Sequence, residues 1–151
     1  MNKKRILLPL LIVCTLLLGL SLYAQMNRPY HHGSAWTVTF LQVKPGMDVA
    51  YLNYLTTDWK KEQEALKASG ITLSYKVLTT EGHSSNDWNL MLLTEYKDMA
   101  TLEASEKKAD ALGQKLVGTD EKQMQGYKDR LAIREIMGTR LAREVILTPE
   151  M

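Results

Sequence analysis

The hydrophobic period of this chain alternates between that of a strand and that of a helix, and the order of these changes restricts the fold more than any other feature. Residues 35–43 (AWTVTFLQV) are rich in β-branched and aromatic side chains, which is typical of a strand. From 48 to 69 the apolar residues recur at helical spacing instead. Residues 71–80 and 88–96 return to strand-like sequence, and the turn formers at 81–87 between them predict an antiparallel hairpin.

The second half of the chain makes the same change from helix to strand. Asp98 is a good N-cap for a helix whose apolar stripe reaches Leu116, and Gly118 interrupts it. A third helix is expected after this break, with apolar side chains aligned on one face (Met124, Tyr127 and Leu131). Residues 139–147 (TRLAREVIL) alternate well enough for a final strand, with a continued helix as the alternative.

The order strand, helix, strand, strand, broken helix, strand is the split βαβ pattern of a ferredoxin-like α+β fold. It predicts a four-stranded antiparallel sheet with helices on one face, in one domain over residues 35–149. Residues 25–34 (QMNRPYHHGS) are polar and lack periodicity, so we expect a flexible tether there. His31 and His32 in this segment lack further ligands, and no metal site is expected.

Both faces of the predicted sheet carry apolar side chains. The face expected to cover the helices holds Trp36, Val38, Phe40, Leu73, Tyr75, Val77, Leu90 and Leu92. The opposite face is expected to mix apolar residues (Leu41, Val43, Leu78, Met91 and Leu93) with polar ones (Thr37, Thr39, Ser74, Lys76 and Asn89). A sheet with one face in water should alternate more cleanly. We therefore expect the second face to be covered, most simply by a second copy of the chain.

The turn VKPGM at the end of the first strand leads at once into a helix carrying Tyr51, Leu52 and Leu55. In this turn and in element order, residues 36–147 resemble the dimeric α+β barrel superfamily, which includes ABM-type monooxygenases and NIPSNAP-like and EthD-like proteins. The resemblance implies a homodimer whose two sheets enclose a pocket on the faces away from the helices. The candidate pocket residues are then Thr37, Thr39, Ser74, Lys76, Asn89 and Met91.

Members of this superfamily differ in chemistry, so the resemblance does not bring a mechanism with it. Some oxidise small aromatic compounds without a cofactor and some degrade haem. His83 falls in a hairpin loop, which counts against haem chemistry, and no metal or nucleotide-binding motif occurs in the sequence. No cofactor is expected.

The N-terminal segment predicts export. Basic residues at 3–5, an apolar run over 6–22 and small residues near Gln25 make residues 1–24 a secretory signal peptide, with an uncleaved membrane anchor as the alternative. The exported domain, periplasmic or secreted, has no cysteine, because Cys14 lies in the signal. Three of the 19 basic side chains also lie there, which leaves 16 against 17 acidic ones, and no basic stripe indicates nucleic-acid binding.

Two functions fit this sequence. The preferred one is a small, exported, homodimeric α+β barrel protein that acts as a non-catalytic binding or dimerisation module for a small apolar ligand. The alternative is a cofactor-independent, ABM-type monooxygenase-like enzyme acting on a small aromatic compound, with Thr39, Asn89 and Met91 near the substrate. We prefer the first because no nucleophile or acid–base pair stands out in the sequence.

Overall fold

The computed structural model describes residues 29–81, 84 and 87–148. The predicted signal peptide at 1–24, with its single cysteine, and His83 of the hairpin loop lie outside the described residues. Export and cleavage therefore stay predictions.

The described residues belong to two compact units. One comprises residues 33–144 and contains the sheet and helices discussed below. The other contains residues 29–32 and 145–148, in which the Thr148 N–H donates to the Pro29 carbonyl at 2.8 Å.

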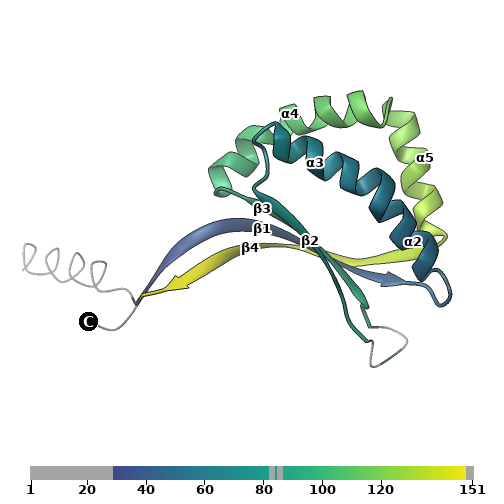
Figure 1. Cartoon of the computed structure of the whole chain (residues 1–151), viewed down its shortest axis with the longest axis horizontal. Coiled ribbons are helices and arrows are strands. Elements are labelled where there is room, and N and C mark those ends of the chain that lie inside the picture. The colour runs from purple at the N-terminus through teal and green to yellow at the C-terminus, as the bar shows by residue number, and fades with distance from the viewer. Residues whose placement is uncertain (1–28, 82–83, 85–86, 149–151) are drawn as a thin grey trace, which may run out of the picture. The chain divides into compact units, whose positions relative to one another are not determined.

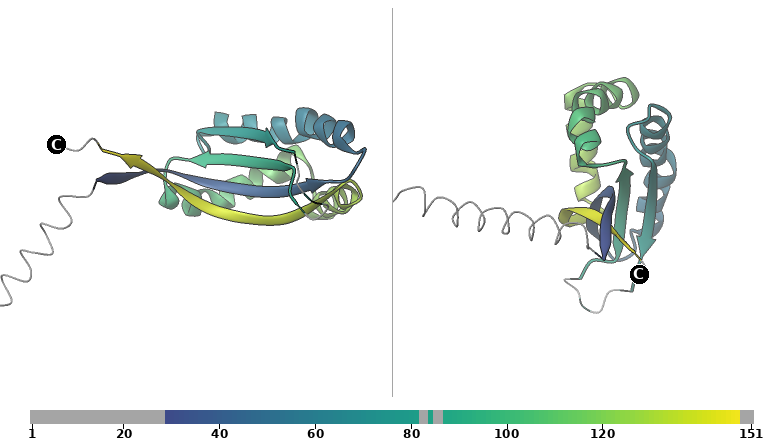
Figure 2. Two further views of the ribbon diagram at one scale, coloured as in Figure 1. Left: turned by 90° about the horizontal axis from the view of Figure 1, so that it is seen from below. Right: turned by 90° about the vertical axis from the view of Figure 1, so that its left-hand side faces the viewer.

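Helices and strands follow one another in the predicted order. They are β1 (Tyr30–Val43), α2 (Asp48–Tyr54), the π-helical segment η1 (Leu55–Trp59), α3 (Lys60–Ala68), β2 (Ser74–Thr79), β3 (Leu90–Tyr96), α4 (Met99–Leu116), α5 (Asp120–Leu131) and β4 (Arg134–Leu147). The sheet order is β2-β3-β1-β4, with β3 antiparallel to both β2 and β1. Figures 1 and 2 show the helices on one face of this sheet. The ferredoxin-like α+β fold is thus confirmed.

Strands β1 and β4 both begin earlier than their sequence patterns predicted. β1 starts at Tyr30, so the prediction of a tether is wrong for residues 30–34. The backbone N–H and hydroxyl of Ser34 donate to the Glu144 carboxylate at 3.2 and 3.1 Å, a long-range partner that the local pattern could not reveal. β4 starts at Arg134, and the helix alternative for 139–147 is wrong.

Local signals for the helix ends are confirmed. The Thr101 N–H donates to the Asp98 carboxylate at 2.7 Å, as an N-cap requires. Gly70 ends the first helical run with φ of 72°, a left-handed conformation that glycine adopts without strain. Within that run the π-helical segment sets Leu55 and Trp59 on the buried side together with Tyr51.

The core lies between β1, β3 and the first helical run. Its buried members are Leu41, Val43, Tyr51, Leu55, Trp59 and Leu90. Partly buried side chains packed against them include Tyr75, Val77 and Leu92, so the predicted helix-facing sides of β2 and β3 are confirmed at these positions. Leu73 is about half exposed and precedes β2, contrary to its predicted place in the core.

The predicted face of β1 is wrong. Because Leu41 and Val43 are in the core and alternate residues share a face, Thr37 and Thr39 lie on the helix side as well. Trp36, Val38 and Phe40 therefore lie on the side away from the helices, and so do their partners in β3. Apolar residues occur at both odd-numbered and even-numbered positions of this strand. Alternation alone therefore could not predict which of its faces is buried.

Truncation of Leu41 tests the assignment of this face of β1 to the core. Its side chain is 1% exposed, and truncation to alanine should lower the free energy of unfolding by about 2–5 kcal/mol because a cavity remains. Val49→Ala, at a helix position 72% exposed, should change it by less than about 0.5 kcal/mol. Urea denaturation of both variants measures the difference, and equal effects would contradict the assigned face.

Candidate functional site

The sheet face away from the helices carries a set of mainly apolar side chains. Strand pairing arranges its side chains in rows, which are Trp36–Glu95–Ser74, Val38–Leu93–Lys76 and Phe40–Met91–Leu78. We call these residues, with Trp88, the open face. Among the described residues, Figure 1 shows no helix on this side of the sheet.

Side chains of the open face already contact one another. The Phe40 and Trp88 rings meet edge to face with centroids 5.2 Å apart. The Lys76 ammonium lies 5.5 Å from the centre of the Trp36 ring, within cation–π range. At one end, the Ser74 hydroxyl donates to the carboxylate of its cross-strand partner Glu95. The face is therefore a pre-arranged apolar surface with a small polar margin.

The structure separates the predicted pocket residues. Ser74, Lys76 and Met91 lie on the open face, as expected. Thr37 and Thr39 lie on the helix side of β1, for the reason given above. The hydroxyls of Thr39 and Thr139 are 3.2 Å apart and share a hydrogen bond.

Asn89 borders a small cleft of about 130 Å³, but its side-chain amide is bonded to backbone. Its side-chain oxygen accepts from the Val43 N–H at 2.8 Å, and its side-chain nitrogen donates to the Val43 carbonyl at 3.0 Å. Its own backbone N–H donates to the Leu41 carbonyl at 3.0 Å. The amide thus extends the pairing of β1 with the strand that follows the hairpin, and both of its ends are already engaged.

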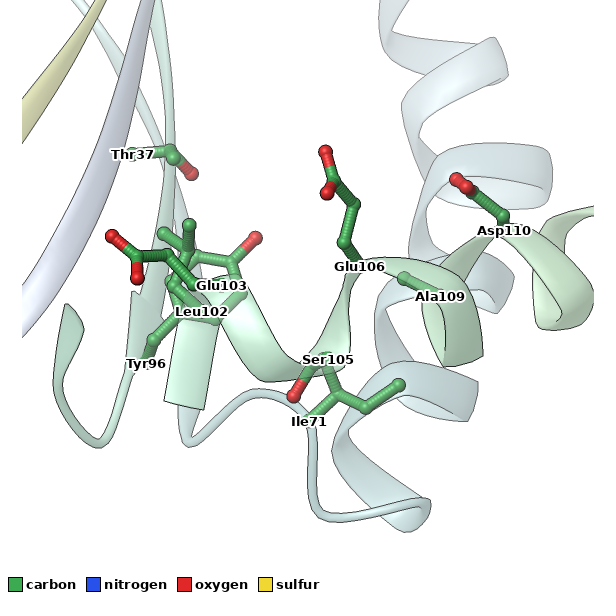
Figure 3. A pocket seen from close by; sticks show the side chains of 9 residues that line it. All are labelled: Thr37, Ile71, Tyr96, Leu102, Glu103, Ser105, Glu106, Ala109 and Asp110. Atoms are coloured by element: carbon green, nitrogen blue, oxygen red, sulfur yellow. The ribbon is translucent and has the colours of Figure 1, made fainter. Parts of the chain in front are cut away.

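A cavity of about 280 Å³ lies beside α4 on the helix side of the sheet. Its apolar lining comes from Ile71, Leu102 and Ala109, with Thr37 and Tyr96 from the sheet, as Figure 3 shows. Carboxylates also line it, all from one face of α4 (Glu103, Glu106 and Asp110). The sequence did not predict this cavity, because the charged run of α4 is indistinguishable from an ordinary solvated helix face.

A second group of titratable side chains lies where α2, α3, α5 and β4 meet. Burial raises the pKa of Tyr51, although a hydrogen bond and the charge of Arg134 oppose the rise. Burial also raises the pKa of Tyr54 to about 12, against the nearby charge of Arg130. The pKa of Glu62 is raised by burial too, and the same Arg130 opposes it. These groups were not singled out in the sequence as a site.

Two negative findings apply to the described residues. Within them, no three His, Cys, Asp or Glu side chains are grouped so that they could hold a metal ion. In the same part of the chain, no helix is both long and apolar enough to cross a bilayer.

The described residues thus form an α+β structure in which helices cover one face of the sheet and the other face is mainly apolar. No protein-family model and no curated protein sequence matches the chain. Solved structures do match: it is similar to HapK from Hahella chejuensis, with a TM-score of 0.48 and 6% identity over 73% of this chain and 91% of that chain.

Two further solved structures match over similar lengths. A dimeric ferredoxin-like protein from an uncultured marine organism gives a TM-score of 0.46 and 13% identity over 80% of this chain and 100% of that one. A NIPSNAP family protein of unknown function from Agrobacterium tumefaciens gives 0.45 and 10%, over 78% and 92%.

We expect removal of the Asn89 side-chain amide to destabilise the fold. Asn89→Ala leaves the N–H and carbonyl of Val43 without their partners, which should lower the free energy of unfolding by about 1–3 kcal/mol. Asn53→Ala, on the exposed side of α2, is the matched control and should cost less than about 0.5 kcal/mol. Denaturant unfolding compares them, and a neutral Asn89 variant would show that the two bonds do not hold the strands together.

Proposed function

We propose that this protein is an exported homodimeric binding module in which the open faces of two copies pack against each other. The observation that carries the proposal is the apolar open face, which presents Trp36, Phe40 and Trp88 together on a sheet side that none of the described helices covers. Contiguous apolar surface of this kind marks an interaction site in a water-soluble domain. Large aromatic side chains are also the residues that contribute most at interfaces.

A second copy is the occupant that this face fits best. Two sheets packed face to face lie about 10 Å apart, a gap that interdigitating side chains of this size fill. The face carries one charge of each sign, Lys76 and Glu95, so two copies related by a two-fold axis can present complementary charges. A partner surface of a single charge sign would leave one of them opposed.

The cavity beside α4 supports the binding half of the proposal. It lies on the helix side, apart from the surface that a second copy would cover. Its apolar part from Ile71, Leu102 and Ala109 suits the apolar body of a small ligand, and the carboxylates of α4 at its margin would favour a ligand that also carries a donor or a positive charge. The monooxygenase-like alternative receives no such support. Its expected substrate residues are dispersed, because Thr39 and Met91 lie on opposite faces and the Asn89 amide is engaged with backbone.

The dimer is tested by a charge placed at the centre of the open face. Val38→Glu buries a carboxylate at the proposed interface, which costs several kcal/mol per ion and should raise the dimer dissociation constant at least ~100-fold. Val49→Glu adds the same charge at an exposed helix position and should leave the dimer intact. Sedimentation equilibrium gives the constants, with circular dichroism to confirm folding. A wild-type monomer, or a dimer that tolerates Val38→Glu, would refute the open-face interface.

Export is tested independently of the dimer. Protein recovered from the exported fraction should begin at Gln25, as N-terminal sequencing would show. Leu11→Arg, which interrupts the apolar core of the signal, should hold the chain in the cytoplasm, whereas Asn2→Arg should not. A mature chain that still begins at Met1 and sediments with membranes would establish the anchor instead.

A further inference from the structure

The two edges of the sheet are protected to different degrees. They are formed by β2 and β4, and Figure 2 shows β4, in yellow, along one of them. β2 is six residues long and carries Lys76, and a short edge strand with a lysine is a common protection against pairing with another chain. β4 is 14 residues long and contains neither lysine nor proline. The edge formed by β4 is therefore the one more available for a further strand.

The second half of β4 is exposed along its length. Every residue of the range 139–144 is exposed, and Leu141 keeps 51% of its surface in solvent. Within the described residues β4 has a neighbouring strand, β1, on one side only. One row of its backbone N–H and C=O groups thus has no strand partner there, and such a row is a template for main-chain pairing.

The direction of the side chains in this segment follows from one contact. Thr139 shares a hydrogen bond with Thr39, which lies on the helix side of the sheet. Because successive residues of a strand point to opposite faces, Arg140, Ala142 and Glu144 lie on the side away from the helices.

A chain of hydrogen bonds agrees with this assignment. Glu144 accepts from the Ser34 hydroxyl, which in turn accepts from the Trp36 indole N–H of the open face at 2.9 Å. Ile136, in contrast, packs against the core on the helix side, so the alternation of β4 shifts by one residue between Ile136 and Thr139. The part of β4 that can pair in a regular register therefore begins after this shift.

We propose that β4 of one copy pairs antiparallel with β4 of a second copy, about a two-fold axis at Ala142. In this register Arg140 of each copy lies opposite Glu144 of the other, which gives two pairs of opposite charge on one face. On the other face Leu141 lies opposite Arg143, whose aliphatic stem can cover it. The small Ala142 lies opposite itself, where the two backbones are closest.

Both members of the charge pair keep capacity for a further bond. Glu144 receives the backbone N–H and hydroxyl of Ser34 on Oε2, and a carboxylate has a second oxygen that accepts as well. Nη1 of Arg140 donates to the Thr139 carbonyl at 3.1 Å, whereas a guanidinium has five N–H donors in all. Neither side chain has to give up its present partner to form the pair.

Other registers fit less well. Pairing displaced by one residue, so that Leu141 lies opposite Ala142, would set Arg140 opposite Arg143, and like charges in that position are destabilising. Pairing about Thr139 would set Glu135 opposite Arg143, but the shift in alternation places these two side chains on opposite faces of the sheet. The self-complementary register about Ala142 is why a second copy, rather than an unrelated strand, is the expected occupant.

This contact goes beyond the proposed open-face dimer and does not depend on it, because it uses the edge of the sheet. The paired range 140–144 is short, and interfaces of small area are weak. Edge pairing should therefore appear at higher protein concentration than the open-face dimer and join two such dimers.

Cysteine cross-linking tests the register. In a chain with Cys14→Ser, Ala142→Cys introduces the only cysteine. Directly opposite residues of antiparallel strands have Cα atoms about 4.5–5.5 Å apart, within the range that a disulfide spans. Mild oxidation should give at least ~tenfold more disulfide-linked dimer than with Thr139→Cys, an exposed control whose two copies would lie roughly 20 Å apart.

Charge reversal tests the contact that sets the register. Added to the Ala142→Cys chain, Arg140→Glu places like charges opposite each other and should reduce cross-linking at least ~tenfold. Lys128→Glu makes the same change of charge at an exposed position of α5 and should not affect it. Val38→Glu, which disrupts the proposed open-face dimer, should also leave the cross-link, so failures of the two proposals are distinguishable.

Three outcomes would overturn the inference. The cysteine at position 142 could cross-link no more than the one at position 139. Arg140→Glu and Lys128→Glu could have equal effects, which would remove the role of the charge pair. In a mixture with Lys76→Cys copies, Ala142→Cys could link to position 76 in preference to itself, which would show that β4 pairs with β2 of the second copy instead.

Discussion

The packing of the first helical run onto β1 determines what the rest of this molecule can do. Tyr51, Leu55 and Trp59 reach the sheet together because the π-helical segment keeps them on one side of the run. They pack against Leu41 and Val43, so the odd-numbered residues of β1 face the interior. The even-numbered residues, which include the bulky Trp36 and Phe40, must then face away from the helices. An apolar surface on that side is stabilised when another surface covers it. The proposed dimer is thus a consequence of which side of one strand the helices occupy.

Sequence reasoning succeeded where the controlling interaction is local. Hydrophobic period and element order predicted the fold class, and short-range signals such as the Asp98 cap and Gly70 predicted helix ends. It failed where the decision is made by distant residues. The buried face of β1 packs against Tyr51, and Ser34 near the start of the same strand bonds to Glu144, so both involve residues outside the strand's own pattern.

The candidate site was predicted only in part for the same reason. Ser74, Lys76 and Met91 were placed correctly because their strands were assigned the right faces. Asn89 was expected to seek a polar partner, but that partner is the Val43 backbone, far away in sequence, and alternation cannot indicate it. The only signal of the arginine cluster in the sequence is the spacing of Arg130 and Arg134, four residues apart. This spacing is a weak signal, because it places two residues on one face only within a helix, and Arg134 is the first residue of a strand.

The two sides of the sheet leave different interactions unsatisfied. On the open face the unmet requirement is apolar surface, which any well-fitting apolar partner removes, and a second copy is always available. On the helix side the unmet requirement is directional, because buried guanidinium N–H groups need acceptors at defined positions. Non-directional surface favours association, whereas fixed donors favour selection of a particular chemical group. These two requirements lie on opposite sides of the sheet, so covering the open face leaves the surroundings of the buried guanidinium groups unchanged.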